Sequence, residues 1–153
     1  MSRFLEKETF KTIIDNTPLI SIDFIVKHDE KILLGFRKNK PAFGYYFTLG
    51  GRVYKNETLI DAKQRILKDE LGITTDYTQL TTHFLGVFEH FYDDSIFDDI
   101  STHYVNHGYL LQLDKELINL PQEQHSEYKW FTIKELLQSD EVHDYVKLYF
   151  KTV

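Results

Sequence analysis

The segment that most constrains the fold is a glycine pair followed by a strongly patterned helix. Residues 50–73 read GGRVYKNETLIDAKQRILKDELGI. At about 100° per residue, the apolar side chains from Leu59 onward fall in one sector, and Gly72 stands where helices often end in the left-handed conformation. The sector contains Leu59, Ile60, Ala62, Ile66, Leu67 and Leu71. We therefore predict a helix over residues 58–71 with one apolar face.

A carboxylate interrupts this apolar face. Glu70 lies near the middle of the sector, one turn below Ile66. A buried carboxylate needs a cation, a cluster of hydrogen bonds or a cleft. On the helix alone, a glutamate that reaches solvent or a structural pair with an arginine explains the pattern as well as a ligand does. Asp69 and Arg65, at the edge of the sector, are four residues apart and close enough to pair.

Strand-like segments surround this helix along the sequence. Predicted strands cover residues 19–28, 31–38, 80–92, 101–113 and 127–131. The first two form a hairpin about the turn HDEK, and an acidic loop joins the two longest. Helical spacing in residues 5–16, and a capping box of Thr132 and Glu135, add helices at both ends. Without repeats or linkers, residues 1–153 are predicted to form a single α+β domain, an α/β/α sandwich.

The composition excludes several classes of function. The 153-residue chain has a formal net charge of −6 and no long basic run, so a nucleic-acid partner is not expected. It contains no cysteine, which excludes disulfides and thiolate metal sites. The N-terminal residues lack the apolar core of a signal peptide, and no apolar run approaches the ~18 residues that span a membrane. We expect a soluble, cytoplasmic protein with no membrane partner.

The spacing of the central segment resembles the Nudix box. Gly51, Glu57, Arg65, Glu70, Gly72 and Ile73 stand at the intervals of that motif. The resemblance implies the Nudix fold, a mixed β-sheet with a loop–helix–loop that binds Mg²⁺ beside a diphosphate. This fits the chemistry, because hard cations prefer carboxylate and carbonyl oxygens and glycines let backbone carbonyls approach an ion.

The chain departs from the usual box at one carboxylate. The family normally has a glutamate directly after the arginine, where this chain has Ile66, and Glu-Glu where it has Asp69 and Glu70. Because position 66 is the i−4 neighbour of Glu70, one of two carboxylates facing the same cation is lost. We therefore expect a single, weakly held Mg²⁺ that takes ligands from outside the box.

One branch of the family shares this defect, and the similarity to it covers nearly the whole chain. The stretches that carry it are TPLISIDFIV, LLGFRKNKPAFGYYF, GGRV, EHFYDD, STHYV and LPQEQH. They resemble the GDP-mannose mannosyl hydrolases. That resemblance implies a homodimer whose substrate is a GDP-hexose, either GDP-mannose or GDP-glucose. Water attacks the anomeric carbon of the sugar, and the products are GDP and a free hexose of inverted configuration.

The reaction assigns roles at the diphosphate. Glu70 is the expected metal carboxylate, and by resemblance Gln124 and the Gly50 carbonyl complete the protein ligands. Arg37 and Arg52 offer guanidinium forks to phosphate oxygens. Tyr104 can donate from its hydroxyl. Bound Mg²⁺ would stabilise the charge that develops on GDP.

A base must activate water on the far side of the sugar. His125, on a predicted loop with the sequence QEQH, is the candidate general base, because imidazole titrates near working pH. Asp23 and His90 are candidates for binding sugar hydroxyls or orienting water. Without the resemblance, any of the seven histidines is more often structural than catalytic. Arg37 would equally suit a solvated turn, and Tyr104 a strand core.

Two other functions stay open. A conventional Nudix pyrophosphohydrolase would attack phosphorus and release GMP and a sugar phosphate, although the loss of a carboxylate at Ile66 weakens this hypothesis. A non-catalytic nucleotide-sugar sensor would bind intact substrate without turnover. The acidic pairs at residues 93–94 and 98–99 lack the spacing of a calcium loop and are interpreted as a solvated turn.

Overall fold

The structure is a computed structural model that describes residues 4–117, 120–121 and 125–151. The helices are α1 (Lys7–Asn16), α2 (Leu59–Leu71), α3 (Ile133–Gln138) and α4 (Asp144–Leu148), with a 3-10 helix η1 (Tyr77–Gln79). The strands are β1 (Leu19–His28), β2 (Lys31–Arg37), β3 (Tyr46–Phe47), β4 (Leu49–Arg52), β5 (Thr81–Tyr92), β6 (Thr102–Leu113) and β7 (His125–Thr132). No helix of the described part is long and apolar enough to cross a membrane.

The seven strands of the described chain form one mixed sheet with β1 at its centre. The main order is β3-β2-β1-β6-β5, while β4 pairs with β1 and β7 pairs with β2. Strands β1 and β6 run parallel, from Leu19 opposite Tyr104 to His28 opposite Leu113. The other pairings are antiparallel. Strand β2 pairs with β1 only over residues 26–28 of β1, which leaves the preceding part of the same edge to β4. This pairing of β4 brings the glycine pair beside Asp23.

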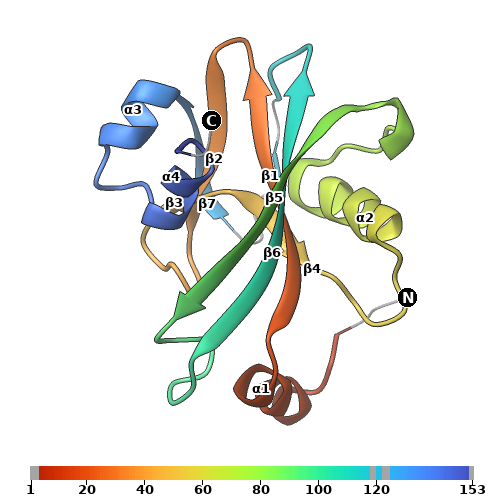
Figure 1. The fold of residues 1–153 in the computed structure, drawn as a ribbon, viewed down its shortest axis with the longest axis vertical. Helices are drawn as coiled ribbons and strands as arrows, with labels where there is room; N and C mark the ends of the chain where they lie inside the picture. The colour runs from red at the N-terminus through yellow and green to blue at the C-terminus, as the bar shows by residue number, and fades with distance from the viewer. Residues whose placement is uncertain (1–3, 118–119, 122–124, 152–153) are drawn as a thin grey trace.

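Helices cover both faces of this sheet, as the α/β/α prediction requires. Figure 1 shows α2 on one side of the sheet and α3 and α4 on the other. One core cluster lies beneath α2 and includes Ile66, Leu67 and Leu111. A second cluster, on the face covered by α3 and α4, includes Leu136 and Val146. The α+β class and the α/β/α sandwich are thus confirmed.

Helix α2 has the predicted ends. Thr58 caps its first turn by accepting a hydrogen bond from the Asp61 backbone N–H at 3.1 Å, and Gly72 ends it with φ of 71°. Thr132 likewise caps α3, accepting from the Glu135 N–H. These ends were predictable because capping depends on residues within one turn of the helix terminus.

The apolar face of α2 is exposed in its first turn. Leu59 and Ile60 are 42% and 54% exposed, whereas Ala62, Ile66, Leu67 and Leu71 are buried. Periodicity gives the direction in which a side chain points but not how far the sheet extends beneath the helix, and the core begins only at Ala62. Lys63 is buried instead, with its ammonium 3.9 Å from the ring centre of Tyr109.

This difference predicts unequal costs for two matched substitutions. Ile66→Ala would leave a cavity under α2 and lower the free energy of unfolding by about 2–5 kcal/mol. Ile60→Ala removes the same atoms from an exposed site and should cost less than about 1 kcal/mol. Denaturant unfolding followed by circular dichroism measures both. Equal losses would contradict the observed burial of the helix.

Candidate active site

Two consecutive glycines let neighbouring elements approach closely. Gly50 and Gly51 lie in β4, where they pair with Asp23 and Ile22 of β1. A Cβ atom on Gly50 would collide with the Ile22 carbonyl oxygen and lie 2.7 Å from Asp23 Oδ1. A side chain at position 50 would therefore push β4 away from β1 or displace the Asp23 carboxylate.

Ile66 fills the contact between α2 and this glycine pair. A Cβ atom on Gly51 would lie 3.2 Å from Ile66 Cγ1, and Ile66 is 1% exposed. The position at which the Nudix box normally has a glutamate is thus part of the hydrophobic core. Among the residues that the structure describes, no group of three or more Asp, Glu or His side chains is placed to hold a metal ion. Glu70, one turn further along α2, supplies a carboxylate to the cleft beside the glycines.

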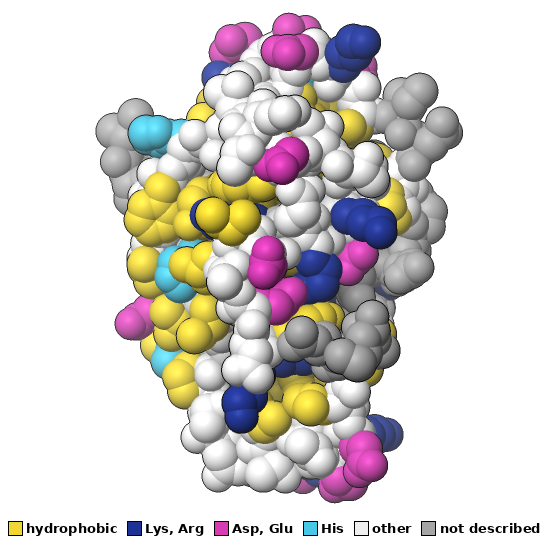
Figure 2. Space-filling view, turned by 90° about the vertical axis from the view of Figure 1, so that its right-hand side faces the viewer, with side chains coloured by type: hydrophobic (Ala, Val, Ile, Leu, Met, Phe, Trp, Pro, Cys, Tyr) yellow, Lys and Arg dark blue, Asp and Glu magenta, His cyan; other side chains and the backbone are white. Residues whose placement is uncertain are grey.

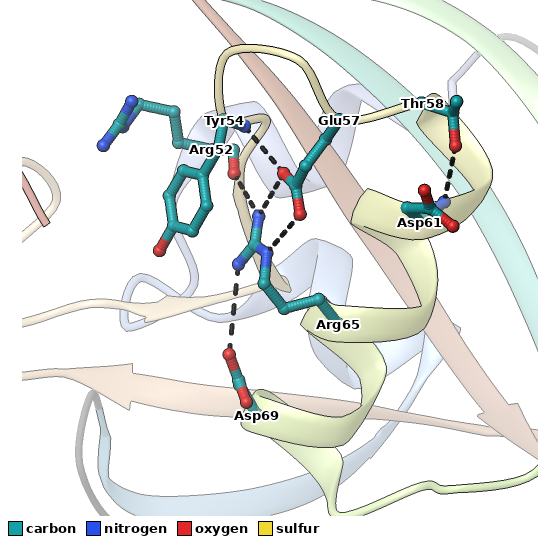
Figure 3. A network of polar contacts seen from close by, with 7 residues as sticks. All are labelled: Arg52, Tyr54, Glu57, Thr58, Asp61, Arg65 and Asp69. Atoms are coloured by element: carbon teal, nitrogen blue, oxygen red, sulfur yellow. Dashed lines mark hydrogen bonds and ion pairs between the residues drawn. The ribbon is translucent and has the colours of Figure 1, made fainter. Parts of the chain in front are cut away.

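The two other charged residues of the box hold its loop against its helix (Figure 3). Arg65 donates from Nε to Glu57 Oε2 at 2.7 Å, and from Nη2 to Glu57 Oε1 at 3.0 Å and to the Arg52 carbonyl at 2.7 Å. The Tyr54 N–H also donates to Glu57 Oε1. Arg65 Nη1 lies 3.9 Å from Asp69 Oδ2, as the i,i+4 spacing predicts. The Glu57–Arg65 pair is therefore structural, and it fixes the backbone on which Arg52 stands.

Most of the predicted site residues line one cavity. Its volume is about 530 Å³ when the solvent at its open side is counted. Its lining includes Asp23, Arg37, Gly50, Arg52, Glu70, His90 and Tyr104. An outer groove shares Arg37, Arg52, Glu70 and Tyr104 with the cavity and is also lined by aromatic side chains such as Tyr54 and Phe10. The two hollows thus form one cleft, with the arginines where they meet.

The cationic part of the cleft is held by aromatic rings. The Arg52 guanidinium lies 4.8 Å from the ring centre of Phe10 and 4.9 Å from that of Tyr54. Burial lowers the pKa of Arg52, which nonetheless stays charged at neutral pH. Burial raises the pKa of Tyr104, against the effect of the neighbouring Arg37 and Arg52, so its phenol keeps its proton and can donate. These groups give a net acidic protein the local positive charge that a diphosphate requires.

Asp23 is oriented by a buried network that sequence reasoning missed. Its Oδ2 accepts from Asn106 Nδ2 at 2.5 Å and from the Tyr149 hydroxyl at 2.7 Å, and Ser21 donates to Asn106 Oδ1. Asn106 is fully buried. A Cβ atom on Gly108 would lie 2.5 Å from the Tyr149 ring, so this glycine makes room for it. The partners are 83 and 126 residues from Asp23 in the chain, and only the parallel pairing of β1 with β6 could have indicated the first.

His90 faces the same cavity as a buried, neutral imidazole. It is 2% exposed, and its ring stacks on Tyr145 with 4.3 Å between ring centres. Burial lowers the pKa of His90, although the nearby Asp23 carboxylate opposes the shift. Its Nε2 has no hydrogen-bond partner among the described residues. A ligand in the cavity can therefore supply one.

The predicted loop position of His125 is wrong. His125 begins β7 opposite Arg37, is 1% exposed, and packs so closely on β2 that a Cβ atom on Gly35 would lie 2.5 Å from its Nδ1. Its Nε2 lies 3.7 Å from Glu70 Oε1, and neither ring nitrogen has a hydrogen-bond partner within the described chain. The ring is thus enclosed beside Glu70 and is not part of the cavity lining. The predicted ligand Gln124 lies outside the described residues.

The available donors suit a hard cation. Glu70, with 13% of its side chain exposed, and the backbone of Gly50 both border the cavity. Carboxylate and carbonyl oxygens are the ligands that Mg²⁺ prefers, usually with water and substrate phosphates completing the shell. A site with this few protein oxygens fits an ion that is bound together with a diphosphate.

The sandwich and the loop–helix–loop agree with the fold that the resemblance to the Nudix box implies. The chain belongs to the Nudix family, because the family model described as "NUDIX domain" matches residues 18–151. The recognition of the family from the box spacing is thereby confirmed.

Relatives and solved structures agree with this assignment. The chain is 41% identical over 125 residues to the low-salt glycan biosynthesis protein Agl8 of Haloferax volcanii, covering 81% of this chain and 77% of that protein. It is 38% identical over 71 residues to an ADP-ribose pyrophosphatase of Methanocaldococcus jannaschii, covering 46% of this chain and 40% of that one. Its fold matches the crystal structure of a MutT Nudix hydrolase from Burkholderia pseudomallei with a TM-score of 0.70 at 24% identity, over 90% of this chain and 99% of the other.

Proposed function

We propose that this protein hydrolyses a GDP-hexose, GDP-mannose or GDP-glucose, to GDP and free hexose. In this reaction Mg²⁺ is required, and water attacks the anomeric carbon with inversion. The observation that carries the proposal is Ile66, which lies in the core where the Nudix box normally has a second carboxylate. Attack at phosphorus usually depends on a richer set of carboxylates that hold metal and orient water. Attack at carbon requires only that GDP leave easily and that water be activated on the opposite face.

The arginine-lined part of the cleft is the proposed diphosphate site. Arg37 and Arg52 border both the cavity and the outer groove, so a diphosphate between them would place its two substituents in the two hollows. Tyr104 can donate to a phosphate oxygen. Neutralising the diphosphate makes GDP a better leaving group, which removes the need for a protein acid to protonate it. The aromatic groove beyond Arg52 would receive the guanosine.

The proposed metal ligands are Glu70, the Gly50 carbonyl and Gln124, of which the last lies outside the described residues. Mg²⁺, when bound there, supplies Lewis-acid stabilisation of negative charge on the leaving diphosphate. Glu70 is positioned by α2, whose contact with β4 depends on Ile66. His125 lies beside Glu70, with 3.7 Å between Nε2 and Oε1.

The cavity beyond the arginines is the proposed hexose site. Asp23 offers a fixed carboxylate for sugar hydroxyls or for the attacking water, and His90 offers a neutral nitrogen. His125 is the proposed general base. In the described conformation its Nε2 faces Glu70, so its ring must leave that contact before it can accept a proton from water.

A homodimer in the cytoplasm completes the proposal. Figure 2 shows hydrophobic and histidine side chains gathered along one side of the α2 face. The strand register places Phe84, Val87 and Phe91 of β5 and Ile20 of β1 on this face, each 50–58% exposed. Exposed apolar patches of this kind mark interaction sites. The lack of cysteine suits a reducing compartment.

A second candidate is pyrophosphate hydrolysis at phosphorus, which is favoured by the similarity to an ADP-ribose pyrophosphatase over part of the chain. Hydrolysis of GDP-mannose in ¹⁸O-water with Mg²⁺ separates the candidates. We expect mass spectrometry to find the label in free hexose and none in GDP. Label in GMP or a sugar phosphate would establish the phosphorus route instead, and tight binding without products would indicate a sensor.

The role of His125 predicts a large rate effect with little effect on binding. His125→Gln should lower turnover by about two to four orders of magnitude, the usual contribution of a general base. The affinity for GDP should change little, because the proposed base acts on water at the hexose and not on the diphosphate. Steady-state kinetics and a GDP titration measure these quantities, with His83→Gln, at an exposed position, as the control. If His125→Gln retains a near-normal rate while Asp23→Asn does not, the base belongs to the cavity wall.

A further inference from the structure

Thr48 carries a buried hydroxyl group that no described residue satisfies. It lies between β3 and β4, is 3% exposed and lines the cavity. Its Oγ1 has no hydrogen-bond partner in the described part of the chain. A buried, unsatisfied hydroxyl costs about 1–3 kcal/mol, and valine has the same shape without that cost. The hydroxyl is therefore explained best by a partner that enters from the cavity.

A second unsatisfied group shares this wall. His90 Nε2 is also buried without a partner, and its ring centre lies 6.0 Å from that of Phe47, the residue before Thr48. Thr48, His90 and Asp23 line the inner cavity and not the outer groove, whereas Arg37 and Arg52 line both. The inner cavity thus collects a hydroxyl, an imidazole and a carboxylate on the side of the arginines away from the groove.

The chemistry of this wall selects its occupant. A phosphate there would meet the Asp23 carboxylate and lose energy by like-charge repulsion. A purely apolar group would leave the Thr48 and His90 atoms unsatisfied. A ring that carries several hydroxyls can donate to Asp23 and exchange hydrogen bonds with both other groups, because hydroxyls donate and accept.

We propose that Thr48 is a specificity-determining residue whose hydroxyl hydrogen-bonds a hydroxyl of the hexose of the bound nucleotide sugar. This rests on the proposed function, since it assumes a nucleoside diphosphate hexose as the ligand. A site built to pair with a hydroxyl rejects ligands that lack it, because its own polar groups are then left unpaired. Thr48 therefore contributes to the preference for the sugar nucleotide over the bare nucleotide.

The test compares Thr48→Val with Thr48→Ser, which removes a methyl group and keeps the hydroxyl. Affinities for GDP and GDP-mannose are measured with Mg²⁺ by rapid-mixing competition against a fluorescent GDP analogue, over times too short for GDP-mannose to be hydrolysed, and hydrolysis is recorded separately. Thr48→Val should weaken GDP-mannose binding about tenfold, as the loss of one buried hydrogen bond implies. It should leave the affinity for GDP unchanged. Thr48→Ser should keep the ratio of the two affinities within about threefold of the natural protein.

Thermal unfolding without ligand supplies an independent readout. Thr48→Val should melt at the same or a higher temperature, because it removes an unsatisfied polar atom from the free protein. A lower melting temperature would show that the hydroxyl already has a partner, and would overturn the proposal. So would an unchanged affinity ratio, or equal losses for GDP and GDP-mannose. Failure of Thr48→Val to fold would overturn the proposal for the same reason as a lower melting temperature. If the natural protein binds GDP-mannose but does not hydrolyse it, the proposed function is contradicted. The role of Thr48 is then decided by whether Thr48→Val weakens the binding of GDP-mannose relative to that of GDP.

Discussion

The close approach of α2, β4 and β1 at the glycine pair is the constraint on which the site depends. Gly50 leaves room for the Asp23 carboxylate, and Gly51 leaves room for Ile66. Without these two contacts the helix and the central strand could not border the same cleft. Glu70 borders that cleft from α2 and Asp23 borders it from β1. The arginines lie where its two hollows meet. Backbone proximity thus determines which side chains can act on one ligand.

Ile66 links packing to chemistry. By filling the space above Gly51 it stabilises the helix, and by the same contact it removes a ligand that the motif normally provides. The remaining charged residues of the box, Glu57 and Arg65, are engaged with each other and with the loop backbone. Glu70 is the box carboxylate that borders the inner cavity. In the proposed reaction, a metal ion held this sparsely would depend on the substrate for its other oxygens, so metal binding and diphosphate binding would be coupled.

The sequence predicted correctly those features that depend on residues close together in the chain. The ends of α2 follow from Thr58 and Gly72, and the alternation of β5 and β6 places both strands within one residue of their predicted bounds. Seven of the predicted site residues line one cavity, and they were assigned from a family resemblance and from the chemistry of their side chains. The exposed Leu59 and Ile60, the strand position of His125, and the Asn106–Tyr149 support of Asp23 could not be predicted. Each depends on contacts between segments that are distant in the sequence, and periodicity does not encode such contacts.

The central claim is that one divalent ion, held by Glu70 and shared with the substrate diphosphate, serves the reaction. Mn²⁺ in place of Mg²⁺ can be counted directly by electron paramagnetic resonance in the presence of GDP. The account predicts one bound Mn²⁺ per chain, weak binding when GDP is omitted, and loss of the bound ion in Glu70→Gln. Two or more ions per chain, or normal binding in Glu70→Gln, would contradict it.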